Sequence, residues 1–77
     1  MKKNIMIVGM GAQGSTVAKF IDKEPNAGMI VCADRDKIAV DNVVTALKNG
    51  KGVILDGPDD VAIAKAAKDY DIDIIVS

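Results

Sequence analysis

Three glycines near the start of the chain stand at a spacing that suits phosphate binding. Gly9, Gly11 and Gly14 form the pattern Gly-x-Gly-x-x-Gly directly after the aliphatic run at residues 5–8. In such a turn the first glycine allows a sharp bend, the second lets an anion approach the backbone, and the third lets a helix pack closely on a sheet. Backbone N–H groups at the start of that helix bind the anion without a lysine. We therefore expect a pyrophosphate-binding turn.

An acidic residue follows at the distance that this pattern requires. Asp34 lies twenty positions after Gly14, at the end of a second apolar run, residues 29–33. A carboxylate there accepts hydrogen bonds from the hydroxyls of an adenosine ribose. It also repels a 2′-phosphate, which favours NAD, whereas Arg35 beside it can pair with that phosphate, which would permit NADP. The alternative for Arg35 is an ion pair with Asp36 or another acid.

Four more residues are expected to belong to the cofactor site. Met10, Ala12 and Gln13 line the turn and would contribute chiefly their backbone N–H groups, with Met10 placed on the adenine side. Asp56 follows a third apolar run, where a carboxylate can accept a bond from the adenine amino group. The alternative for Asp56 is an N-cap role at the next helix.

The elements that must position these residues alternate between strands and helices. Short aliphatic runs predict buried strands at residues 4–8, 29–33, 52–55 and 72–76. Helices are predicted between them, at residues 12–24, 37–50 and 58–70. This alternation predicts an α/β fold with a parallel sheet and right-handed crossovers. We expect half of a doubly wound, Rossmann-type sheet with strand order 3-2-1-4, in one domain covering residues 1–77.

Helical spacing also predicts which residues face the sheet and where helices begin and end. The first two helices would bury two sets, Gly14, Val17, Ala18 and Ile21, and Val40, Val43, Val44 and Leu47. Asn49 and Gly50 are expected to end the second helix. Pro58 would begin the third helix, with Asp59 and Asp60 in its first turn, where the helix dipole favours negative charge.

The composition excludes several classes of function. A net charge of -1 over 77 residues disfavours nucleic-acid binding, and aromatics at 3% imply an aliphatic core. The chain has no histidine, and its one cysteine, Cys32, is expected to be a buried apolar residue, so we expect no metal site and no catalytic residues. Neither a signal peptide nor an apolar run of about 18 residues is apparent, so we expect a cytoplasmic protein without a membrane partner.

Three stretches of the sequence resemble one family. The stretches KNIMIVGMGAQGSTVAKFI, VCADRDK and VILDGPDDVAIAKAAKDYDIDIIVS are similar to the N-terminal part of saccharopine dehydrogenase-like oxidoreductases. The resemblance implies an NAD(P)-dependent oxidoreductase that acts on amino-acid-like substrates. Family members run to several hundred residues and carry a substrate domain. We therefore expect a truncated gene, a fragment or an excised domain that is inactive alone. The matching residues are Gly9, Gly11, Gly14, Asp34, Arg35 and Asp56.

Two other functions and one mode of association remain open from the sequence. The regulatory nucleotide- or NAD-sensing domains of potassium channels and transporters look similar, with the same kind of glycine turn and acidic strand end. A methyltransferase that uses S-adenosylmethionine is disfavoured because residues 4–8 contain no acid before the glycines. The predicted strand 72–76 would leave an apolar edge unpaired, so we expect two chains to pair there as a homodimer.

Overall fold

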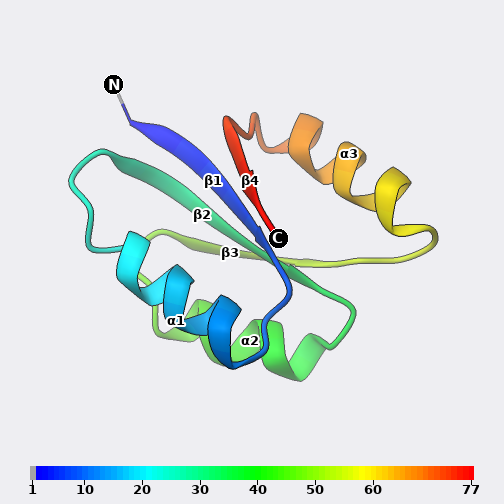
Figure 1. Ribbon diagram of the computed structural model, residues 1–77, viewed down its shortest axis with the longest axis horizontal. Coiled ribbons are helices and arrows are strands. Elements are labelled where there is room, and N and C mark those ends of the chain that lie inside the picture. Colours follow the sequence, from blue (N-terminus) through cyan, green and yellow to red (C-terminus); the bar gives the residue numbers. More distant parts are fainter. Residues whose placement is uncertain (1) are drawn as a thin grey trace.

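Residues 2–77 fold as a four-stranded sheet with three helices (Figure 1). The computed structural model describes residues 2–77. In chain order the elements are β1 Lys3–Val8, α1 Ala12–Ile21, β2 Ala27–Asp34, α2 Lys37–Thr45, β3 Gly50–Ile54, α3 Asp59–Asp69 and β4 Ile74–Val76. Within this described part, no helix is both long enough and apolar enough to span a bilayer.

The strands are all parallel and lie in the order β3-β2-β1-β4, which confirms the predicted fold class. Helices α1 and α2 cover one face of the sheet and α3 lies on the other (Figure 1). The chain winds outward from β1 to β3 and then crosses to the far side of β1. The strand order therefore reverses between β1 and β4, and in open α/β sheets this is where ligands bind.

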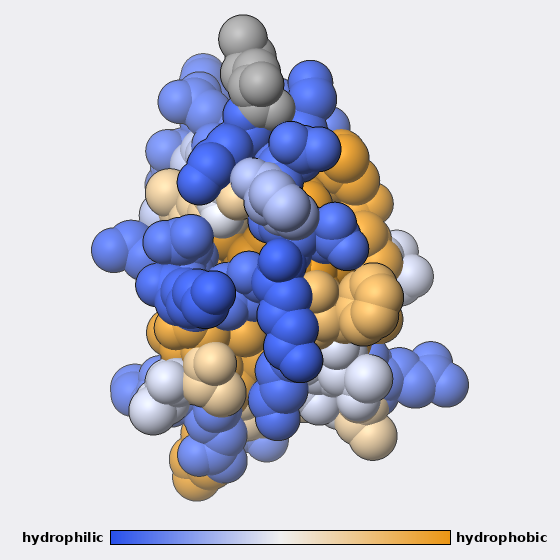
Figure 2. All heavy atoms as spheres, turned by 90° about the vertical axis from the view of Figure 1, so that its left-hand side faces the viewer, coloured by the Kyte–Doolittle hydropathy of each residue, from blue (hydrophilic) through white to orange (hydrophobic). Residues whose placement is uncertain are grey.

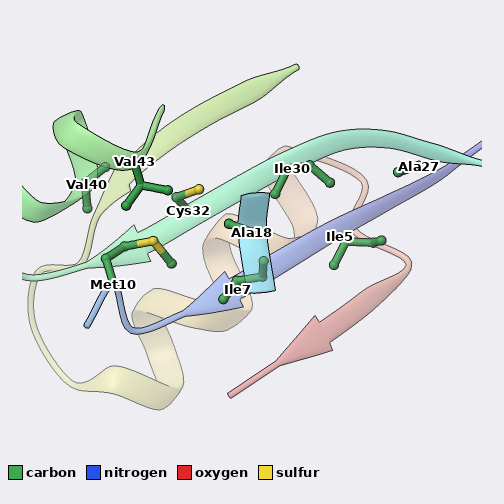
Figure 3. Close-up of a cluster of buried hydrophobic side chains, with 9 residues drawn as sticks. All are labelled: Ile5, Ile7, Met10, Ala18, Ala27, Ile30, Cys32, Val40 and Val43. Carbon is green, nitrogen blue, oxygen red and sulfur yellow. The ribbon is translucent and has the colours of Figure 1, made fainter. Parts of the chain in front are cut away.

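Aliphatic side chains from alternate strand positions fill a core on each face of the sheet. On the α1 and α2 face, Ile7, Ile30 and Cys32 pack with Ala18 and Val40 (Figure 3). On the α3 face the fully buried residues are Met6, Val31 and Ala33. The predicted helix faces are confirmed for Val17, Ile21, Val43 and Val44, which also lie in or against the first cluster. Leu47 packs against this cluster as well, but from the segment after α2.

The prediction for the end of the second helix was wrong. Helix α2 ends at Thr45, and Gly50 is already the first residue of β3. The Asp22 carboxylate, at the end of α1, accepts hydrogen bonds from the N–H groups of Lys48 at 2.8 Å and Asn49 at 3.3 Å. These bonds hold residues 48 and 49, just before β3, outside the helix.

Asn4 joins three segments at the amino end of the sheet. Its side-chain oxygen accepts from Met29 N–H in β2 at 3.0 Å, and its side-chain nitrogen donates to the carbonyls of Tyr70 and Asp71 after α3. Around this end hydrophilic side chains dominate the surface, with apolar residues toward the flanks (Figure 2). The polar network here joins β1 to β2 and to the segment after α3.

Strand β4 forms one edge of the sheet. It pairs with β1 on one side, and no other strand in residues 2–77 pairs with its outer side. Ile74 and Ile75 are about half exposed, at 47% and 49%. An apolar open edge of this kind is a site for pairing with another chain. The homodimer through this edge stays a prediction.

Candidate functional site

The fold itself requires two of the three glycines in the turn after β1. Gly9 has φ +97, a backbone conformation that side chains disfavour, and its N–H donates to the Ala33 carbonyl in β2 at 2.7 Å. At Gly14 a β-carbon would lie 1.8 Å from the Gly9 carbonyl oxygen. Gly9 therefore shapes the turn, and Gly14 lets α1 start directly against it.

Gly11 is different, because the fold does not require a glycine there. Its φ of -72 and ψ of -168 suit any residue. A β-carbon added at Gly11 would meet no atom within 4 Å in the described residues. The missing side chain leaves open space beside the start of α1. A glycine in this pattern can serve a sharp bend, close helix packing or close approach of a ligand. At Gly11 only close approach of a ligand applies.

The first turn of α1 presents unpaired N–H groups to this space. The first helical hydrogen bond runs from Ser15 N–H to the Gly11 carbonyl at 3.0 Å. No atom of residues 2–77 accepts a hydrogen bond from the backbone N–H groups at the start of α1, which are those of Gly11, Ala12, Gln13 and Gly14. The hydroxyls of Ser15 and Thr16 point back to the Ala12 carbonyl and do not cap these groups. The helix therefore offers donors and the positive end of its dipole to an anion.

Asp34, the last residue of β2, both holds the glycine turn and presents acceptors. Its Oδ2 accepts from Met10 N–H at 2.7 Å, and its Oδ1 accepts from Asp36 N–H at 3.1 Å. These bonds, the one from Met10 foremost, lower the pKa of the Asp34 carboxyl below its usual range. The group is therefore ionised at neutral pH. A carboxylate has about four acceptor positions, so capacity remains for ribose hydroxyls.

Arg35 reaches from the end of β2 to the start of α3. Its guanidinium donates to the Gly57 carbonyl and to the Asp59 carboxylate, which is the ion pair with another acid that the sequence left open. Gly57 has φ +79, so a glycine suits this position, and the chain turns there to bring Asp59 opposite Arg35. The sequence-based prediction placed Asp59 in the first turn of α3, which is confirmed, but did not include it in the site.

Two hollows meet at the glycine turn. One, of about 210 Å³, is lined by Val8, Gly9, Asp34, Arg35, Leu55 and Asp59. The other, of about 470 Å³, runs along the start of α1 to Val76 and Ser77. Both include Val8 and Gly9, so together they cross the carboxyl ends of β2, β1 and β4. They lie at the position where the strand order reverses, with the free N–H groups of α1 in the second hollow.

The structure does not bring Met10 or Asp56 into the site as expected. The Met10 side chain is 5% exposed and points into the core on the α1 and α2 face (Figure 3), so it does not lie on an adenine side, and its N–H is bound to Asp34. Asp56 lines a separate hollow between β3 and α3, together with Tyr70. The N-cap alternative for Asp56 is wrong, because Pro58 is the N-cap residue of α3 and, within the described chain, no side chain caps it.

Cys32 lies inside β2 and is fully buried. Burial raises the pKa of its thiol to about 11, with a further contribution from Asp22. The thiol is therefore protonated at neutral pH and takes no part in the site. It packs as a small apolar side chain, which confirms the prediction.

The sequence matches no protein-family model and no curated protein.

Proposed function

We propose that this chain binds a dinucleotide, as the NAD(P)-binding domain of a saccharopine dehydrogenase-like oxidoreductase. The observation that carries the proposal is Gly11. This glycine opens space beside four unpaired N–H groups, although the fold itself does not require a glycine there. A pyrophosphate needs open space, hydrogen-bond donors and the positive end of a helix dipole at the same place.

The two hollows support a dinucleotide rather than an isolated phosphate. The smaller hollow contains the ionised Asp34, which would accept hydrogen bonds from the adenosine ribose. The larger hollow continues from the turn toward Val76 at the end of β4 and would take the nicotinamide half. NAD is favoured over NADP because the negative charge of Asp34 repels a 2′-phosphate.

In this proposal the chain's residues bind and orient the cofactor. Bound NAD would supply hydride transfer. The first turn of α1 would hold the pyrophosphate, and Asp34 would hold the ribose. The acid–base groups and the amino-acid-like substrate would belong to a separate substrate domain, and the reaction would take place in the cytoplasm.

Calorimetric titration of the chain with NADH tests the proposal. We expect saturable binding with a Kd below about 1 mM, equivalent to a binding free energy stronger than about -4 kcal/mol. Parallel titrations with ATP and AMP separate dinucleotide binding from the sensing of mononucleotides. Tighter binding of either nucleotide than of NADH would favour the regulatory sensor. The absence of heat at several millimolar NADH, with the circular dichroism spectrum of a folded protein, would count against any dinucleotide function.

A further inference from the structure

The only arginine of the chain is held at the mouth of the smaller hollow. Arg35 has two acceptors on one segment, the Gly57 carbonyl and the Asp59 carboxylate. The side chains of Arg35 and Asp59 remain 52% and 67% exposed, so both are accessible from solvent. Both also line the hollow that contains Asp34. The contact therefore borders the space where the adenosine ribose would lie.

The charges around this hollow determine how it would treat an extra phosphate. Asp34 and Asp59 both carry a carboxylate, and Arg35 is the one basic residue in its lining. A phosphate on the ribose carries between about one and a half and two negative charges, so it would need Arg35 as its partner. Asp59 already pairs with one nitrogen of that guanidinium, Nη2, and adds a second negative charge beside the first.

We infer that Asp59 is a specificity-determining residue that selects NAD against NADP by holding Arg35 and repelling the 2′-phosphate. This inference rests on the proposed function, since it concerns the same site. An exposed ion pair alone is weak. Asp59 has two effects on NADPH binding: it holds Arg35, and it repels the 2′-phosphate. Removing its charge therefore releases Arg35 and lowers the repulsion of the phosphate. Arg35 alone would then allow either cofactor.

The test compares the affinities of NADH and NADPH in the chain and in the variant Asp59→Asn. Asn keeps the shape of the side chain and removes its charge. We expect the Kd for NADPH to fall by about fivefold to tenfold, and the Kd for NADH to change by less than about twofold. The matched control is Asp60→Asn, which removes the same charge from the same helical turn but not from a partner of Arg35. It should leave the ratio of the two Kd values unchanged.

A second variant separates release of Arg35 from a general change of charge. Adding Arg35→Gln to Asp59→Asn should remove most of the gain in NADPH affinity, because the freed guanidinium is then absent and only the lowered repulsion remains. The inference is overturned if Asp59→Asn leaves the ratio unchanged, if Asp60→Asn changes it equally, or if the whole gain survives Arg35→Gln. In each of these cases NADH binding by the unaltered chain still supports the proposed function. If the unaltered chain binds neither cofactor, both proposals fail.

Discussion

Replacing Gly14 with alanine should lower the free energy of unfolding by about 3 kcal/mol, because the new methyl group has no room. Its carbon would lie 1.8 Å from the carbonyl oxygen of Gly9 and 2.9 Å from the carbonyl carbon. Both atoms are backbone, so no flexible side chain can move aside. Relief would require α1 to shift away from the turn, and α1 carries Ala18 into the core.

Urea denaturation followed by circular dichroism measures this effect. A domain of this size is expected to have a total free energy of unfolding of only about 4 to 12 kcal/mol. A loss of this size should therefore clearly lower the urea concentration at the midpoint of unfolding. Gly11→Ala is the matched control, because it adds the same methyl group in the same turn, where it meets no atom within 4 Å in residues 2–77. A Gly14→Ala protein within about 1 kcal/mol of the original would show that α1 is not packed as described.

The second large effect is on binding rather than folding. Gly11→Ala should weaken NADH binding at least tenfold, because the methyl group enters the space that a pyrophosphate needs beside the first turn of α1. The free energy of unfolding should change by less than about 1 kcal/mol. Alanine is a poorer N-cap than glycine but has less conformational freedom to lose on folding, and these effects oppose each other.

Calorimetry with NADH and urea denaturation on the same preparation separate the two quantities. Asn42→Ala, an exposed change on α2 that lines neither hollow, controls for the effect of surface substitution on binding. Unchanged affinity in the Gly11→Ala protein would mean that the ligand does not approach the backbone at this residue. The role assigned to Gly11 would then be incorrect.

The order of elements could be predicted because its signals are local: apolar runs and helical spacing identified four strands and three helices. The strand order 3-2-1-4 was predicted by analogy with the doubly wound nucleotide fold, in which the order reverses after the third strand. The ends of the elements were harder to predict. Helix α2 ends at Thr45, and Asp22, far away in the sequence, binds the N–H groups of Lys48 and Asn49 in the segment that follows. A propensity pattern does not contain such a contact.

In the candidate site, too, some features could be predicted from the sequence and others could not. Gly9 and Gly14 were predictable because the pattern states what each must do, and the structure gives the steric reason for both. The second role of Asp34, binding the Met10 N–H, was not, because it joins residues 24 positions apart. Asp59 was missed for the same reason, since it meets Arg35 only through the turn at Gly57.

The most direct measurement is a two-dimensional ¹⁵N–¹H NMR titration of the chain with NADH. It reports on the individual backbone N–H groups that the proposal depends on. We predict that the largest saturable shifts belong to Gly11, Ala12, Gln13 and Gly14, which form no hydrogen bond elsewhere in the described residues. Saturating shifts confined to the hollow between β3 and α3, or no shift at several millimolar NADH, would contradict the assignment of this turn as a dinucleotide site.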